Sequence, residues 1–144
     1  MKVSNLITQK RVITISSSSS VVNLVKLLAE YKIGAVIVSE NGIDVAGKVS
    51  ERDIVRRLNH EMDLSSLKVT DLMTEDVVVC KANDSVDSVM QLMTSRRFRH
   101  CPVVDDNGKL ISIVSIGDIV KAYISELSGE RDALNSYIHN YDFN

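Results

Sequence analysis

The spacing of apolar residues along the chain predicts alternating strands and helices. Short apolar runs at residues 12–15, 35–39 and 45–50 are typical of buried strands. Apolar residues that recur three and four positions apart over residues 21–32 indicate a helix packed on a core. A second helix is predicted to begin at about Glu51, directly after the third strand. The predicted order is therefore strand, helix, strand, strand, helix.

The second half of the chain repeats this pattern. Ser50 and Asp53 recur as Ser115 and Asp118, an offset of 65 residues, and the apolar helix stripe recurs at the same offset. A long repeat of this kind indicates one supersecondary unit used twice. Because each unit is too small to bury an adequate core alone, we expect the two to pack around a pseudo-twofold axis, with ligand clefts between them.

The predicted fold class is therefore α/β, with two β-α-β-β-α repeats and an additional C-terminal helix. We expect the first repeat to span residues 1–62, the second residues 63–126, and the tail residues 127–144. The strand–helix–strand crossover makes part of each sheet parallel. The tail is predicted to be an extra amphipathic helix that packs on a partner subunit or on the core of its own chain. Its apolar residues at helical spacing are Leu127, Leu134, Tyr137, Ile138 and Tyr141.

Cap and turn signals mark the ends of these elements. The polar residues 16–20 and 83–85 predict loops that end at a helix N-cap. Gly34 is predicted to end the first helix. The Asn-Gly pairs at residues 41–42 and 107–108 predict tight turns between strands.

Composition narrows the classes of function. The chain has 144 residues, 44% of them hydrophobic, and a net charge of −2, which favours a compact soluble protein without electrostatic attraction to nucleic acid or membranes. Cys80 and Cys101 align with core positions of the first repeat, so we expect buried thiols in a reducing cytoplasm and no metal site. Because the sequence shows no P-loop, Rossmann glycines or nucleophile–base set, we expect no catalytic residues and no enzyme activity.

The Ser-x-x-Asp motifs at residues 50–53 and 115–118 have two compatible interpretations. At a strand-to-helix junction the motif is typical of a capping box, which the spacing alone favours. The same junction presents backbone N–H groups and the positive end of a helix dipole to phosphate. The aspartate carboxylate is an acceptor suited to two vicinal ribose hydroxyls.

Basic residues distinguish the second repeat from the first. Arg99 and His100 stand where the first repeat has Gly34 and Ala35, and they are candidates to bind phosphate. The alternative is a solvated basic helix end, where cations are favoured anyway. Arg52, whose counterpart in the second repeat is a glycine, is a second phosphate candidate, with a surface ion pair as its alternative.

Residues 50–53, 115–118 and 97–105 together resemble the signature of cystathionine-β-synthase (CBS) domains. The resemblance extends from about residue 3 to residue 123 and is closest to small stand-alone prokaryotic tandem CBS pairs, also called Bateman modules. It implies an energy-sensing regulatory protein that binds AMP, ADP, ATP, NAD or an adenosyl compound between the repeats. It also implies a homodimer formed by CBS–CBS packing, and a protein partner that reads the bound state.

The resemblance assigns roles to individual residues. Asp53 and Asp118 are expected to hold ribose, with Ser50 and Ser115 supporting ribose or phosphate, and the basic residues above are expected to bind phosphate. Ser112 stands where the family often has a glycine, which predicts unequal occupancy of the two clefts. The adenine is expected to lie on Val12, Ile13, Val78, Val79, Gly34, Ala35 and Val36.

Two other functions remain compatible with the sequence. One is an interaction protein whose clefts are vestigial. The other is a nucleic-acid-binding protein that uses the basic cluster at residues 96–100, against which the net charge argues.

Overall fold

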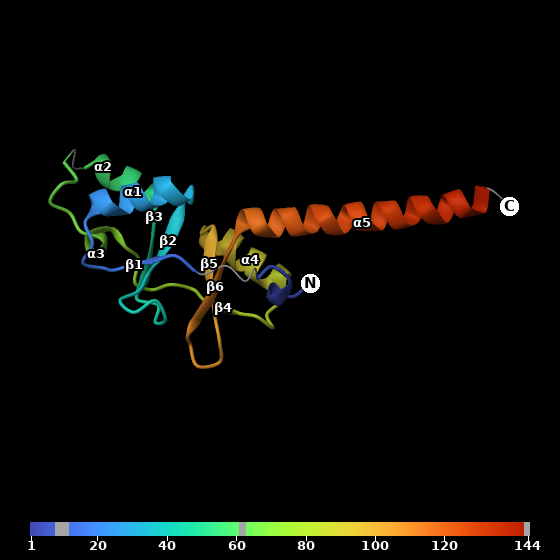
Figure 1. The fold of residues 1–144 in the computed structure, drawn as a ribbon, viewed down its shortest axis with the longest axis horizontal. Helices are drawn as coiled ribbons and strands as arrows, with labels where there is room; N and C mark the ends of the chain where they lie inside the picture. The colour runs from blue at the N-terminus through green and yellow to red at the C-terminus, as the bar shows by residue number, and fades with distance from the viewer. Residues whose placement is uncertain (8–11, 61–62, 143–144) are drawn as a thin grey trace.

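The computed structural model describes residues 1–7, 12–60 and 63–142, and it confirms the two-repeat α/β architecture (Figure 1). The first repeat contains β1 (Thr14–Ile15), α1 (Val21–Tyr31), β2 (Ala35–Val38), β3 (Gly47–Ser50) and α2 (Glu51–Leu58). The second contains β4 (Cys80–Lys81), α4 (Val86–Arg96), β5 (His100–Val104), β6 (Leu110–Ser115) and α5 (Ile116–Asp142). A lead-in element precedes each repeat, η1 (Val3–Asn5) and α3 (Val69–Leu72).

Each repeat forms its own three-stranded sheet. In the first repeat, β1 pairs parallel with β2, and β2 pairs antiparallel with β3. The second repeat has the same arrangement, with β5 between β4 and β6. The central strands β2 and β5 are largely buried, as their continuous apolar runs predict.

The predicted helix N-caps and strand-to-strand turns are confirmed. The hydroxyl of Ser20 accepts a hydrogen bond from the Asn23 backbone N–H (3.1 Å), and Ser85 caps α4 in the same way. Gly42 and Gly108 have φ of 78° and 79°, the left-handed conformation that a turn between strands requires.

Three predicted boundaries are wrong. The first strand is limited to Thr14–Ile15, and the third begins at Gly47 rather than at residue 45. The first helix ends at Tyr31, because Lys32, rather than Gly34, adopts the left-handed C-cap conformation, with φ 53°. Gly34 instead allows a close approach, since a Cβ there would lie 3.1 Å from Glu51 Oε1.

The lead-in element of the first repeat packs on the second repeat. Val3 is fully buried in the core of the second repeat. Its backbone N–H donates to the carbonyl of Asp84 (2.9 Å), and the Val86 N–H donates to Met1 O (2.9 Å). The extreme N-terminus therefore completes the half of the molecule that is most distant from it in sequence.

The lead-in element of the second repeat makes the reciprocal contacts with the first. Val69 is fully buried in the core of the first repeat. Its N–H donates to Ser19 O (2.8 Å), and the Val21 N–H donates to Leu67 O (3.0 Å). Each core thus needs a segment from the other half of the sequence, and the repeat boundaries near residue 62 stay a prediction.

The predicted C-terminal helix is confirmed, but it is the continuation of the last helix of the second repeat and not a separate element. Helix α5 runs without a break for 27 residues and projects away from the two sheets (Figure 1). Tyr123 donates a hydrogen bond to Asp87 of α4 near its base, while Leu127 and Leu134 are 63% and 58% exposed. The side chains of Tyr137, Ile138 and Tyr141 lie outside the described residues. Within the described part of the chain, no helix combines the length and hydrophobicity needed to cross a membrane.

The exchanged lead-in predicts a stability effect near the N-terminus. Val3→Ala should lower the free energy of unfolding by roughly 1.5–3 kcal/mol, because it deletes apolar groups from a closed core. Val79→Ala is the matched control, since Val79 is 42% exposed and its truncation should cost no more than about 0.5 kcal/mol. Urea unfolding measures both, and equal effects would show that the N-terminal segment does not stabilise the second core.

Candidate functional site

A cavity of about 410 Å³ lies between the repeats. Its volume is within the range of small-molecule sites in proteins. Both repeats contribute to its wall, as expected for a cleft between packed units. The lining residues are Val12, Ile13, Lys32, Ile33, Gly34, Ala35, Val36, His100, Ser112, Ile113, Ser115 and Asp118.

This cavity gathers eight of the residues predicted from the sequence. They are the apolar and small residues of the first repeat together with the polar residues His100, Ser115 and Asp118. Four lining residues were not predicted: Lys32, Ile33, Ser112 and Ile113. Ser112 had a signal in the sequence, since it departs from the glycine that often stands at its family position.

The polar wall of the cavity is the junction between β6 and α5. The Ser115 N–H donates to Asp118 Oδ2 (2.9 Å), and the Asp118 N–H donates to Ser115 Oγ (3.1 Å). The capping interpretation is therefore confirmed here. Among the described residues no hydrogen bond engages Asp118 Oδ1, so one carboxylate oxygen is available as an acceptor at the cavity wall.

The equivalent junction in the first repeat has the same capping box. The Ser50 N–H donates to Asp53 Oδ2 (2.8 Å), and the Asp53 N–H donates to Ser50 Oγ (3.3 Å). The Ser50 hydroxyl also donates to the same carboxylate oxygen (3.0 Å). Neither residue lines the 410 Å³ cavity, so the two motifs share a local structure but stand in different surroundings.

Lys48 distinguishes the surroundings of the first-repeat junction from those of the 410 Å³ cavity. Its ammonium donates to His100 O (2.9 Å) and lies 4.9 Å from the centre of the Phe98 ring. Burial lowers the pKa of Lys48, and the Cys101 and Asp53 groups oppose that effect. The counterpart of Lys48 in the second repeat is Ile113, an apolar residue of the cavity wall. Lys48 is not among the site residues predicted from the sequence, because a lysine within a short strand is usually solvated.

His100 lines the cavity, and its backbone carbonyl accepts the hydrogen bond from Lys48. Burial is the main cause that lowers the pKa of His100, and the positive charges of Lys48 and Arg99 act in the same direction. The negative charges of Asp118 and Glu51 oppose the shift. The neutral imidazole is therefore favoured at neutral pH, and it offers one N–H donor and one acceptor.

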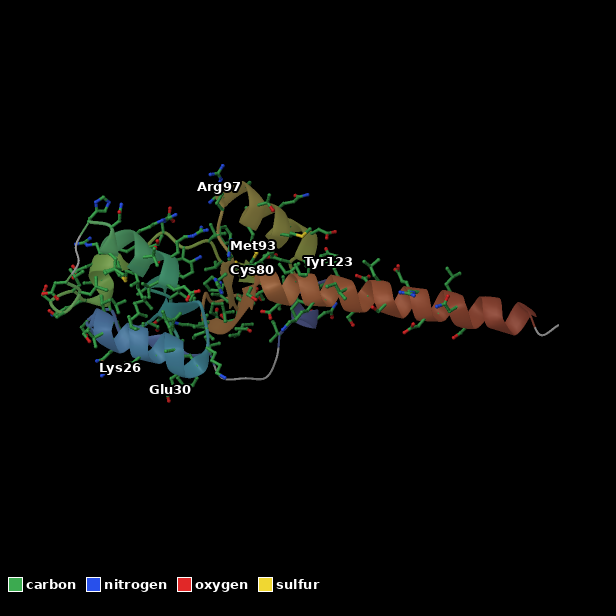
Figure 2. All side chains as sticks on the ribbon, turned by 90° about the horizontal axis from the view of Figure 1, so that it is seen from above. Lys26, Glu30, Cys80, Met93, Arg97 and Tyr123 are labelled. Atoms are coloured by element: carbon green, nitrogen blue, oxygen red, sulfur yellow. The ribbon has the colours of Figure 1, made fainter. Side chains whose placement is uncertain are left out.

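The remaining predicted site residues lie elsewhere. Arg52 and Arg99 line a separate cavity of about 730 Å³. Val79 is 42% exposed, and the carbonyl of Val78 accepts a hydrogen bond from the Cys101 thiol (3.4 Å). Figure 2 shows Cys80 inside the second repeat, and the prediction that both cysteines are buried is confirmed.

Two β-α-β-β-α repeats that exchange their lead-in segments and enclose a cleft define a paired α/β module. The sequence model of the CBS domain matches residues 3–60 and 69–125, so the chain belongs to the CBS domain family. The mitochondrial CBS domain-containing protein CBSX3 of Arabidopsis thaliana is 38% identical in an alignment 128 residues long that covers 85% of this chain and 62% of that protein.

Two solved structures extend the comparison. A putative signal-transduction protein with CBS domains from Burkholderia ambifaria is 38% identical, with a TM-score of 0.80 over 87% of this chain and 95% of that one. CBSX2, solved in complex with AMP, is 27% identical, with a TM-score of 0.72 over 86% of this chain and 96% of that one. The family and the fold predicted from the sequence are confirmed.

The shifted titration of His100 predicts a pH dependence of stability. Because its folded pKa lies below the ordinary value of 6.5, the unfolded chain binds protons more readily as the pH falls through 6.5. The stability contributed by the neutral imidazole is complete above that pH and is lost as the pH falls toward the folded pKa. His100→Asn should therefore lose less stability than the unsubstituted protein between about pH 7.5 and about pH 5.5. Urea unfolding at both pH values measures the difference, and parallel losses would contradict it.

Proposed function

We propose that this protein is a regulatory module that binds an adenine nucleotide in the 410 Å³ cleft between its CBS repeats. The observation that carries the proposal is the cleft itself, where apolar residues of one repeat face a polar helix start of the other. Membership of the CBS family and the similarity to CBSX2, which was solved with AMP, support the same ligand class.

The cleft offers a partner for each part of a nucleotide. The apolar wall of Ile13 and Val36, with the small Ala35, suits the flat adenine ring. Asp118 Oδ1 is the acceptor for ribose hydroxyls, and Ser115 supports it from the same helix start. His100 is the N–H donor that faces the phosphate.

The proposed role is that of a sensor and not of an enzyme. A ligand that contacts both repeats stabilises one packing of the repeats over another, and a protein partner can read that shift. AMP, ADP, ATP and NAD are the candidate ligands, and a cytoplasmic location remains the expectation from the cysteines. If no nucleotide binds, the alternative of an interaction protein with vestigial clefts is favoured.

We infer that one nucleotide binds per chain. Lys48 places its ammonium over Phe98 and against His100 O at the other side of the interface, where the equivalent residue in the 410 Å³ cleft is Ile113. A charged side chain thus stands on that side where the 410 Å³ cleft has an apolar one.

The two matched aspartates test this assignment. AMP at one hundred times its dissociation constant should stabilise the unsubstituted protein by about 2.7 kcal/mol, because it binds the folded state alone. Asp118→Ala should weaken AMP binding by roughly 1.5–3 kcal/mol, since a charge-assisted hydrogen bond to ribose is lost. Isothermal titration calorimetry on the folded variants measures the affinity and the number of sites.

Asp53→Ala is the control for that experiment. Both substitutions remove a capping carboxylate, so each should lower the free energy of unfolding by about 0.5–2 kcal/mol. Only Asp118→Ala should change the affinity for AMP. An unchanged affinity in both variants would mean that the aspartates are helix caps alone, and the absence of AMP binding to the unsubstituted protein would reject the nucleotide proposal.

We also propose that the protein is a homodimer. Exposed apolar side chains gather on helices, with Val22 and Val25 on α1 and Val55 on α2 of the first repeat. Val120 and Ile124 on α5 of the second repeat are also exposed, at 49% and 58%. Clusters of exposed apolar residues on a folded protein mark interaction surfaces, and CBS–CBS packing would bury these.

Light scattering at micromolar concentration should give the mass of two chains. Val55→Glu should shift the mass toward one chain, because Val55 is 65% exposed on α2 and a carboxylate is costly to bury in an apolar interface. Ile43→Glu, in an exposed turn away from the helices, should leave the dimer intact. A monomeric unsubstituted protein would refute the proposal, and a dimer in both variants would place the interface elsewhere.

A further inference from the structure

Helix α5 carries an apolar stripe on a face that the rest of its chain leaves exposed. Beyond its first turns the helix projects away from both sheets, as Figure 1 and Figure 2 show from two directions. Ile119 is fully buried in the core of the second repeat, but the stripe begins at the next residue, which is exposed. The apolar side chains of the stripe are between 49% and 63% exposed: Val120, Ile124, Leu127 and Leu134.

The stripe follows a seven-residue repeat. Its positions are separated alternately by four and three residues, and the sequence of α5 continues this spacing with an isoleucine at 138 and a tyrosine at 141. A mean spacing of about 3.5 residues over about three heptads is typical of a coiled-coil seam, whereas a helix on a globular core follows about 3.6. We use the name α5 seam for Val120, Ile124, Leu127, Arg131 and Leu134.

The residue types in the seam indicate how many helices meet and in which direction. In the heptad abcdefg, positions a and d face the partner helix. Ile124 is at an a position, and Leu127 and Leu134 are at d positions. A β-branched residue at a with leucine at d favours two parallel helices over three or four. The occupant that fits this pattern is therefore one helix of the same kind.

Arg131 and Glu130 supply charge complementarity between two copies of α5. Arg131 is at an a position, and Glu130 is at the g position directly before it. In a parallel, in-register pair, each a residue lies beside the g residue of the other helix, so each Arg131 meets a Glu130 of the second copy. Among the described residues, no side-chain hydrogen bond or ion pair engages Glu130 or Arg131 within the single chain. A single charged layer of this kind costs stability but fixes the register.

The projecting part of α5 is a weak helix by itself. Gly129 and the polar residues around it, Ser125, Ser128, Asn135 and Ser136, have lower helix propensity than alanine or leucine. An isolated helix of about 15–20 residues with such a composition is marginal in water. Packing of the seam on a second helix therefore supplies stabilisation that the single chain lacks.

We propose that the α5 seam packs on the α5 seam of a second copy as a parallel, in-register, two-stranded coiled coil. Val120 and Ile124 begin the seam and are also among the exposed residues that the homodimer proposed above would bury. The coiled coil thus continues that interface along the same two-fold axis, and in this respect the inference rests on the proposed homodimer. Because the seam is short and contains one charged layer, it adds to CBS–CBS packing and does not replace it.

Single cysteines test the register directly. Leu127→Cys and Leu134→Cys each place a thiol at a d position, where the same residue of the two copies lies face to face, and the two natural cysteines are buried. With oxidised glutathione, each variant should form a disulfide-linked dimer on a non-reducing gel. Ser125→Cys and Ser136→Cys, outside the seam, are the matched controls and should cross-link at least about tenfold more slowly. An antiparallel pair brings at most one d position against itself, so cross-linking at one position alone, or no faster than in the controls, would overturn the inference.

Added charge tests the energetic contribution of the seam. Leu127→Glu with Leu134→Glu should raise the dissociation constant of the dimer at least about tenfold, because carboxylates would be buried at two layers. Both leucines are exposed in the single chain, so the fold of the repeats should be unaffected. Ser125→Glu with Ser136→Glu adds the same two charges outside the seam and should change the constant by less than about twofold. Sedimentation equilibrium measures the constants, and equal values for the two double variants would contradict the proposal.

A charge exchange tests the pairing of Arg131 with Glu130. A chain with Arg131→Glu presents two glutamates to its copy, and a chain with Glu130→Arg presents two arginines, so each alone should dimerise more weakly than the unsubstituted protein. An equimolar mixture restores both opposite-charge contacts in a heterodimer, and its dissociation constant should return to within about threefold of the unsubstituted value. Glu126→Arg, at an exposed position outside the seam, is the control and should leave the dimer unchanged. No recovery in the mixture would overturn the parallel register.

The results separate the seam from the other proposals. A dimer weakened by Val55→Glu but not by the seam variants would support CBS–CBS packing and overturn the coiled coil. A dimer weakened by the seam variants but not by Val55→Glu would support the coiled coil and overturn the contribution of α2. Calorimetry with AMP reads the nucleotide cleft independently, because the seam variants leave every lining residue of the cleft unchanged.

Discussion

The exchange of lead-in segments is the constraint on which the rest of the molecule depends. Val3 is buried among residues of the second repeat, and Val69 among residues of the first. Backbone hydrogen bonds tie both segments in place, so neither repeat can complete its core without the other half of the sequence. The exchanged segments thereby link the two repeats whose residues line the cleft between them.

The aspartates in the first turns of α2 and α5 cap their helices and are also placed to contact a ligand. Asp118 uses one carboxylate oxygen to cap α5, and this contact holds the second oxygen in a defined direction. A ligand contact made by a capping residue needs little further ordering, because the side chain has already lost its rotamer freedom. Asp53 caps α2 in the same way, yet Lys48 and Phe98 change the surface beside it. The same local motif therefore supports different chemistry in the two repeats.

Local features of the chain were predictable because they depend on neighbouring residues. The caps at Ser20 and Ser85, the turns at Gly42 and Gly108 and both capping boxes follow from short sequence motifs. The exchange of lead-in segments was not predictable, since a short apolar segment packs equally well on either core as far as its sequence shows. The end of α1 was misjudged because Lys32 adopts a left-handed conformation that glycine usually occupies.

The remaining errors in the predicted site arise from contacts between the repeats. A repeat offset aligns equivalent positions, but it does not show which side chains meet across a pseudo-twofold interface. Lys48 reaches the carbonyl of His100, and Arg56 joins Arg97 at one cavity, although each pair is distant in sequence. Arg52 and Arg99 were predicted as phosphate candidates, but their grouping in a cavity separate from that of His100 required the three-dimensional arrangement.

Helix α5 has a mechanical consequence. Its first turn carries Asp118 at the cleft wall, and its 27 residues extend for about 40 Å, mostly beyond the two sheets. Because the helix begins at the wall of the ligand cavity, a change in its direction there displaces its far end. A tilt of about 10° at its base moves its far end by about 7 Å, the arc that follows from a rise of about 1.5 Å per residue. A change too small to alter either core is thus magnified into a displacement comparable to the width of a helix.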